Sequence, residues 1–266
     1  MRTVRFEQLR PSEIIAERER YPVVFQPLGP LEWHGPHLPV GTDPLHAEAV
    51  ACRVAEQSGG VVMPTLFWGT ERERSPQALQ RIGFRGDEWI IGMDFPPNTM
   101  PSLYSAEDIF GVVVRARLDL LVQQNYRLVV MVNGHGATNH ITVLDRLAAE
   151  FTARGPAQVQ HLIAFSPEPN GEYQVGHADA IETSLMMALY PHAVDLTTLP
   201  DQSTPLRNVD WAIVDAATFG GKPTDEHTVA PENDPRVAAS EEKGNDSLAR
   251  SVQWIQVQVQ KALGMV

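Results

Sequence analysis

The feature that most constrains the fold of this chain is a repeated order of apolar run, loop and helical segment. Five apolar residues stand together at Leu128–Val132, and further largely apolar runs cover 23–28, 60–64 and 159–165. Such runs, without alternating polar positions, are typical of strands buried on both faces. Because helical segments follow the runs, the sequence predicts an α/β fold of three layers (αβα), with helices on both faces of a mostly parallel sheet.

Helical segments are indicated by apolar positions near a 3.6-residue period or by helix-ending residues. Ser12 is the expected N-cap of the first one. The stretch 68–100 is rich in Gly and Pro and aperiodic, which is typical of lids and subunit contacts, and 200–228 is also loop-rich. No linker or repeat divides the chain, so we expect one domain over 1–266. The expected helices are 10–20, 44–56, 105–124, 139–154, 178–189 and 240–263.

Charge and cysteine content exclude several classes of protein. Acidic residues outnumber basic ones by 33 to 21, so the chain lacks the positive surface that binds nucleic acid or an anionic membrane. The single cysteine, Cys52, cannot form an intrachain disulfide and is expected to be a buried thiol. No signal peptide and no run of roughly 20 apolar residues is evident. We therefore expect a cytoplasmic protein.

The first cluster of reactive side chains follows the run at 23–28. Prolines and glycines stiffen this loop, which holds two carboxylates and two imidazoles within 12 positions: Glu32, His34, His37 and Asp43. Imidazole and carboxylate are the usual ligands of catalytic Zn²⁺, Mn²⁺ and Fe²⁺, and a carboxylate such as Asp43 can bridge two ions about 3.5–4 Å apart. The cluster predicts a metal site, although each residue alone would rather be a polar loop residue.

A second loop adds His135, within Asn133–Gly136, directly after the clearest strand. Because ligands bind at the carboxyl ends of parallel strands, His135 can converge with the Glu32 loop although the two lie far apart in the chain. In isolation the motif would indicate a tight turn. A third segment places His177 at the start of an expected helix, where the neutral form of a general base is favoured, with Glu182 on the same side.

Three stretches together resemble the creatininase (creatinine amidohydrolase) family: PLGPLEWHGPHLPVGTD, VNGHG and GHADAIETS. The resemblance implies a layered α/β fold, two divalent metal ions, hydrolysis of C–N bonds in small molecules, and a homo-oligomer, with a hexamer as the expected size. It implies that Asp43 bridges the metals and that His177 serves substrate binding and proton transfer. The metal ligands it implies are Glu32, His34, Asp43 and His135.

One departure from the family pattern concerns the second metal ion. True creatininases carry a glutamate ligand two residues after the histidine of the second motif, where this chain has Ala137. Glu182 is the expected replacement ligand. The change points away from creatinine itself as the substrate.

The expected mechanism is attack of a metal-activated water on a polarised carbonyl, with His177 or a carboxylate such as Glu182 passing the proton on. Zinc is the first expectation for the metal, and Mn or Fe suit the same ligands. Cyclic amides, formamides and a cyclic inositol diketone, in which a C–C bond is cut, are the candidate substrates. Substrate contacts are expected from His37, Trp68, Glu71 and His177.

The specific expectation is the 3-dehydro-scyllo-inosose hydrolase branch, because the long loop offers hydrogen-bonding groups for a polyhydroxylated substrate. These groups are equally explained as solvated surface charges. Two alternatives to an enzyme are a catalytically silent binding or assembly protein on the same fold, and a structural zinc protein, which a single cysteine disfavours. The hydrogen-bonding groups are Glu71, Arg72, Glu73, Arg74, Asp94 and Asn98.

Overall fold

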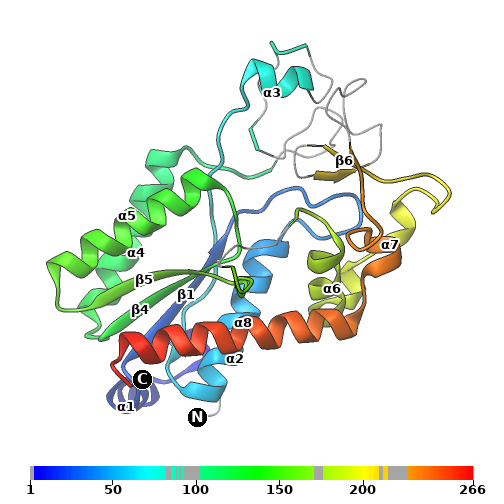
Figure 1. Ribbon diagram of the computed structural model, residues 1–266. Helices are drawn as coiled ribbons and strands as arrows, with labels where there is room; N and C mark the ends of the chain where they lie inside the picture. Colours follow the sequence, from blue (N-terminus) through cyan, green and yellow to red (C-terminus); the bar gives the residue numbers. More distant parts are fainter. Residues whose placement is uncertain are drawn as a thin grey trace.

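A parallel sheet forms the centre of the molecule, with the strand order β2-β1-β4-β5 and with β3 paired to the end of β1 (Figure 1). Every strand pair in it is parallel, so the strands end at the same edge. The strands are β1 Val23–Gly29, β2 Val61–Val62, β3 Leu66–Phe67, β4 Leu128–Asn133 and β5 Gln158–Ile163. The computed structural model describes residues 3–81, 85–87, 89, 91–92, 102–170, 176–209, 212–214 and 227–265.

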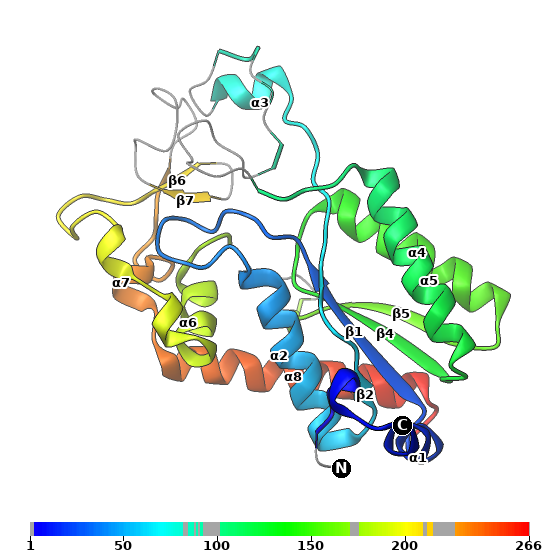
Figure 2. The same cartoon turned by 180° about the vertical axis from the view of Figure 1, so that it is seen from behind.

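Helices cover both faces of the sheet, which confirms the predicted three-layer α/β architecture. α4 and α5 lie on one face, and α2 and α8 lie on the other, where α6 packs against α8 (Figures 1 and 2). Within the described residues, no helix is long and apolar enough to cross a membrane. The helices are α1 Pro11–Arg20, α2 Thr42–Ser58, α3 Pro76–Arg81, α4 Glu107–Gln123, α5 Thr138–Arg154, α6 Ala180–Leu189, α7 Pro235–Ala238 and α8 Glu241–Ala262. Short 3-10 turns cover Phe6–Gln8, Pro191–Ala193 and Leu196–Thr198.

Alternating side chains of the strands build two layers of core. Val24 of β1 packs in one cluster with Phe110 of α4 and Leu144 of α5. Val23 and Phe25 belong to the other cluster, on the side of α2 and α8. Because both faces are covered, β1 and β4 are buried along their whole length, which explains their unbroken apolar runs.

One expected N-cap and one expected helix start are wrong for local reasons. The first helix is capped at Arg10 rather than at Ser12, because the Glu13 carboxylate accepts hydrogen bonds from the backbone and guanidinium of Arg10. The helix expected from 178 begins at Ala180, because the Asp179 side chain caps it by accepting two N–H groups of its first turn.

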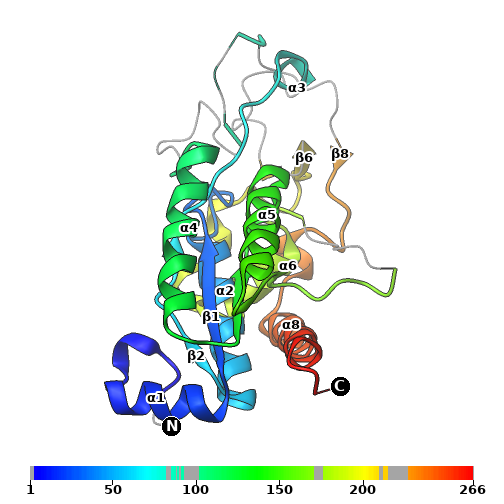
Figure 3. The ribbon, with the colours of Figure 1, turned by 90° about the vertical axis from the view of Figure 1, so that its left-hand side faces the viewer.

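The two aperiodic stretches contain regular structure. Within 200–228 lies a small antiparallel sheet of order β7-β6-β8, formed by Arg207–Val209, Ala212–Val214 and His227–Thr228. Within 68–100 lies α3. Both lie beyond the carboxyl edge of the main sheet (Figure 3). Of the hydrogen-bonding groups singled out in the long loop, Asp94 and Asn98 lie outside the described residues.

Candidate functional site

Two loops begin side by side at the carboxyl edge of the sheet. β1 and β4 are in register, so Leu28 lies beside Asn133, and the Gly134 N–H donates a hydrogen bond of 3.1 Å to the Leu28 carbonyl. The first turn of α2 packs against this edge so closely that a Cβ at Gly134 would overlap the Asp43 carbonyl oxygen. The register and this close approach bring the first two motifs together.

Replacing Gly134 by alanine is expected to lower the free energy of unfolding by about 1–3 kcal/mol, because the added methyl group has no space. Denaturant unfolding measures the loss. The matched control is Gly136→Ala in the same loop, where an added Cβ meets no atom within 4 Å. Equal losses in the two variants would contradict the close approach as the cause.

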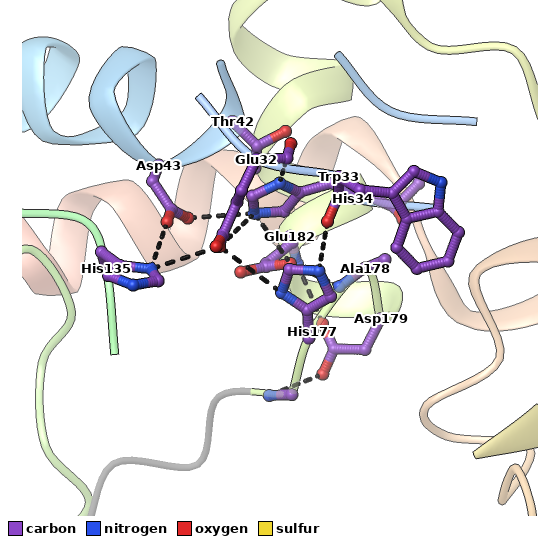
Figure 4. A network of polar contacts seen from close by, with 12 residues as sticks. Glu32, Trp33, His34, Thr42, Asp43, His135, His177, Ala178, Asp179 and Glu182 are labelled. Atoms are coloured by element: carbon purple, nitrogen blue, oxygen red, sulfur yellow. Dashed lines mark hydrogen bonds and ion pairs between the residues drawn. The ribbon is translucent and has the colours of Figure 1, made fainter. Parts of the chain in front are cut away.

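Asp43 lies between His34 and His135 in a buried cluster of carboxylates and imidazoles (Figure 4). Its Oδ1 lies 3.0 Å from His34 Nε2, and its Oδ2 lies 3.0 Å from His135 Nδ1. Glu32 Oε1 lies 3.2 Å from the same His135 nitrogen and 3.7 Å from His34 Nε2. A carboxylate whose two oxygens face two different imidazoles is arranged as a bridging ligand would be.

Glu182 reaches the cluster from α6. Its Oε2 lies 3.9 Å from His34 Nε2 and accepts a 2.5 Å hydrogen bond from the Ala178 N–H. Ala178 has a φ of 56°, in the left-handed region that a non-glycine residue seldom adopts. Strain of this kind is concentrated at functional sites, and here it accompanies a hydrogen bond to a buried carboxylate.

His177 closes the cluster on the side of Trp33. Its Nε2 lies 2.6 Å from the Trp33 carbonyl oxygen, to which it donates, so its Nδ1 lone pair faces Glu32 Oε1 at 3.8 Å. Burial and the neighbouring His34 lower the pKa of His177 to about 4, so its imidazole is neutral at pH 7. A neutral imidazole with Nδ1 open is able to accept a proton.

The buried carboxylates of the cluster favour positive charge beside them. Burial lowers the pKa of His34, but the carboxylates, with Asp43 foremost, outweigh burial and raise it to about 10. Burial likewise opposes protonation of His135, yet Glu32 and Asp43 raise its pKa well above the usual range. Burial raises the pKa of Glu182 to about 8. Buried carboxylates of this density require cations beside them, which can be imidazolium groups or metal ions.

The donor atoms fit divalent metal ions. Two groups of ligand atoms, each within 4.8 Å of one another, share Asp43: one adds Glu32 and His135, and the other adds His34 and Glu182. Nitrogen and carboxylate oxygen without thiolate suit Zn²⁺, Mn²⁺ and Fe²⁺ alike. His34 Nδ1 lies 3.2 Å from the Glu32 carbonyl oxygen, and this contact orients Nε2 toward the site. A third such group consists of Glu32, His34 and His177.

Asn133 holds the second motif in place. Its Oδ1 accepts a 2.9 Å hydrogen bond from the His135 N–H, and its Nδ2 donates one of 2.7 Å to the His135 carbonyl. The same Nδ2 lies 3.2 Å from His161 Nε2, whose ring contacts Asp145 through Nδ1 at 2.7 Å. These contacts fix the turn that presents His135, which is why asparagine at the end of the strand suits the motif.

Tyr104 is a site residue that the sequence did not reveal. It precedes α4, and its hydroxyl donates a hydrogen bond to Glu32 Oε2, which leaves Oε1 for the histidines. The two residues are 72 positions apart, and no motif surrounds the tyrosine. Only the packing of the loop before α4 against the Glu32 loop brings them together.

Removing the Tyr104 hydroxyl with Tyr104→Phe is expected to lower metal affinity by about 10- to 100-fold, because Glu32 loses the partner that orients it. Competition with a chromophoric chelator measures the affinity. The matched control is Tyr126→Phe, since the Tyr126 hydroxyl is buried and has no hydrogen-bond partner in the part of the chain that the structure describes. Unchanged affinity in the Tyr104 variant would contradict the assigned role.

A cavity of about 670 Å³ opens beside the cluster. Four of the five expected metal ligands, Glu32, Asp43, His135 and Glu182, line it, and Ile163 and Phe165 add an apolar wall. Glu71 and Arg72 come from the long loop. The turn and helix start Gly134–Asn139 form a continuous stretch of the wall, and Gly176 and His177 lie on it as well.

Of the four expected substrate contacts, Glu71 and His177 line this cavity. The structure does not bring His37 or Trp68 to it. His37 is buried behind the loop, with Nε2 2.9 Å from the Thr183 hydroxyl, so it fastens the loop to α6. Trp68 is 44% exposed and is not among the described residues of the cavity wall. His37 belongs to the first motif, yet its side chain faces α6 rather than the cavity.

The family profile and the relatives found by comparison with known proteins point to the same family. The family profile of creatinine amidohydrolase (creatininase) matches residues 7–258. Creatinine amidohydrolase of Pseudomonas putida is 30% identical over 198 residues, which cover 67% of this chain and 68% of that enzyme. The mycofactocin precursor peptide peptidase of Mycolicibacterium smegmatis is 27% identical, covering 65% of this chain and 60% of the relative. The 3-dehydro-scyllo-inosose hydrolase of Thermotoga maritima is 26% identical, covering 79% and 65% respectively.

Solved structures show the same likeness over the whole length. A crystal structure of creatinine amidohydrolase superposes with a TM-score of 0.69 at 25% identity and covers 98% of both chains. Creatininase structures at 26% identity and a TM-score of 0.67 include a manganese form and one described as Zn-Zn type.

Proposed function

This chain belongs to the creatininase family, as its three motifs predicted, and from that premise we propose that it is a divalent-metal-dependent hydrolase of a small carbonyl compound. The bond that we propose it cleaves is a C–N amide bond. The single observation that carries the proposal is Asp43, whose two carboxylate oxygens each lie 3.0 Å from the ring nitrogen of a different buried histidine.

Five residues would hold two metal ions in this proposal. Glu32, Asp43 and His135 would hold one, and His34, Asp43 and Glu182 the other. Glu182 would thereby compensate for Ala137. Zinc is the first candidate, with manganese or iron as alternatives, and the manganese and Zn-Zn forms of related creatininases support this range. Bound divalent ions supply Lewis acidity, which polarises a carbonyl and lowers the pKa of a bound water toward about 7.

Two residues beside the metal ligands would transfer the proton and orient a ligand. His177 is neutral, is oriented by the Trp33 carbonyl and presents Nδ1 to the site, so it would accept a proton from the nucleophile and return it to the leaving nitrogen. Tyr104 would keep Glu32 turned so that Oε1 faces the histidines.

An amide is the substrate class that we favour, because relatives include an amidohydrolase and a peptidase, both of which cleave C–N bonds. The alternative is the C–C bond of a cyclic inositol diketone, which the 3-dehydro-scyllo-inosose hydrolase relative supports. Glu71 and Arg72 at the cavity would serve a hydroxylated substrate of that kind.

Metal content and a substrate screen test the proposal. The purified protein is loaded separately with Zn²⁺, Mn²⁺ and Fe²⁺, desalted and measured by elemental mass spectrometry, then screened with cyclic amides, formamides and inositol diketones. About two equivalents of metal with metal-dependent hydrolysis are expected. One equivalent would show that Glu182 does not compensate for Ala137. No bound metal in any preparation would overturn the proposal in favour of a catalytically silent binding protein.

A further inference from the structure

The side-chain amide of Asn133, at the end of β4, can face only one way. Its Oδ1 accepts from the His135 N–H at 2.9 Å, and its Nδ2 donates to the His135 carbonyl at 2.7 Å. Turning the amide over would set two acceptors against each other and two donors against each other, in a side chain that is fully buried. The backbone of His135 therefore fixes Nδ2 on the side of His161.

This orientation determines which nitrogen of His161, on β5, carries hydrogen. His161 Nε2 lies 3.2 Å from Asn133 Nδ2, which only donates, so Nε2 has to accept and carries no hydrogen. The hydrogen of the ring is then on Nδ1, which lies 2.7 Å from Asp145 Oδ1 of α5. The hydrogen bonds thus all run in one direction, from the His135 N–H through Asn133 and His161 to Asp145.

We propose that His161 is a positioning residue for the metal site, which acts through Asn133 on the turn that presents His135. The inference rests on the proposed function, in which His135 binds a metal ion. The His161 side chain is 4% exposed, so water does not readily replace it as the acceptor for Asn133 Nδ2. Residues that orient a ligand in this way contribute to metal affinity although they do not touch the metal.

Two substitutions separate the two nitrogens of His161. The amide of glutamine reaches the position of Nε2, and its oxygen can accept from Asn133. The shorter asparagine reaches only the position of Nδ1, so it can donate to Asp145 but leaves Asn133 Nδ2 without its acceptor. His161→Asn is expected to lower zinc affinity by about tenfold or more, and His161→Gln is expected to restore it.

Competition with a chromophoric chelator measures the zinc affinity of the folded variants. His192→Asn, at an exposed position in the turn after α6, is the control and should bind zinc as the wild type does. A second measurement needs no folded variant. Long-range proton–nitrogen NMR spectra of the zinc-loaded wild type, with isotope-labelled histidine, report which nitrogen of each ring carries hydrogen, and the His161 signals are those missing from His161→Gln. Hydrogen on Nδ1 is expected.

Hydrogen on Nε2 of His161, or equal zinc affinity of His161→Asn and wild type, would overturn the positioning role and leave the proposed function intact. Equal losses of affinity in His161→Asn and His161→Gln would also overturn it, because the residue would then serve the packing of β5 against α5. A wild type that binds no zinc, manganese or iron would overturn both the positioning role and the proposed function.

Discussion

Replacing Asp43 by asparagine is expected to abolish metal binding at both sites and, with it, hydrolysis. Each carboxylate oxygen of Asp43 serves a different group of ligands, one with His135 and the other with His34. Asparagine keeps the size of the side chain but removes its charge, and its amide nitrogen cannot bind a cation. In the proposed two-metal site, one substitution would therefore remove a ligand from both ions at once.

The expected loss in kcat/KM is about a thousandfold or more, which corresponds to about 4 kcal/mol of transition-state stabilisation. Elemental mass spectrometry and steady-state kinetics on the same preparation measure the two effects together. Asp119→Asn, at an exposed position of α4, is the matched control and should retain both metal and activity. Full metal content in the Asp43 variant would rule out the bridging role.

Replacing His177 by glutamine is expected to lower kcat by about 100- to 10,000-fold while metal content stays unchanged. The glutamine amide can still donate to the Trp33 carbonyl, as His177 Nε2 does at 2.6 Å, but it has no nitrogen that accepts a proton at neutral pH. The neutral state follows from the pKa of His177 near 4, which burial and His34 lower from the usual value.

Metal analysis separates this role from ligation. His177 Nδ1 lies 3.8 Å from Glu32 Oε1 and belongs to one of the groups of possible ligands. If the variant lost metal together with activity, His177 would be a ligand rather than the proton acceptor. The control is His192→Gln, which alters an exposed histidine in the turn after α6.

Predictions from the sequence were most successful where a short stretch of residues directly reflects how that stretch is buried. Unbroken apolar runs such as Leu128–Val132 show that a strand is covered on both faces, so they predicted β4 and the layered sheet. Parallel strands end at one edge, so the loops holding Glu32 and His135 were expected to meet, and Asp43 now lies 3.0 Å from His135. Regular structure within 200–228 escaped prediction, because its strands are short.

The sequence by itself thus determined the fold class, because each strand and helix leaves its own pattern of apolar residues. It also determined which ligand atoms two loops can bring to the edge of the sheet, because each loop directly follows a parallel strand. The tertiary structure alone decided that Tyr104 supports Glu32 and that His37 faces Thr183 instead of the cavity. Those facts depend on the packing of distant segments against one another. A side chain's neighbours across such a contact leave no periodic signal in the residues around it.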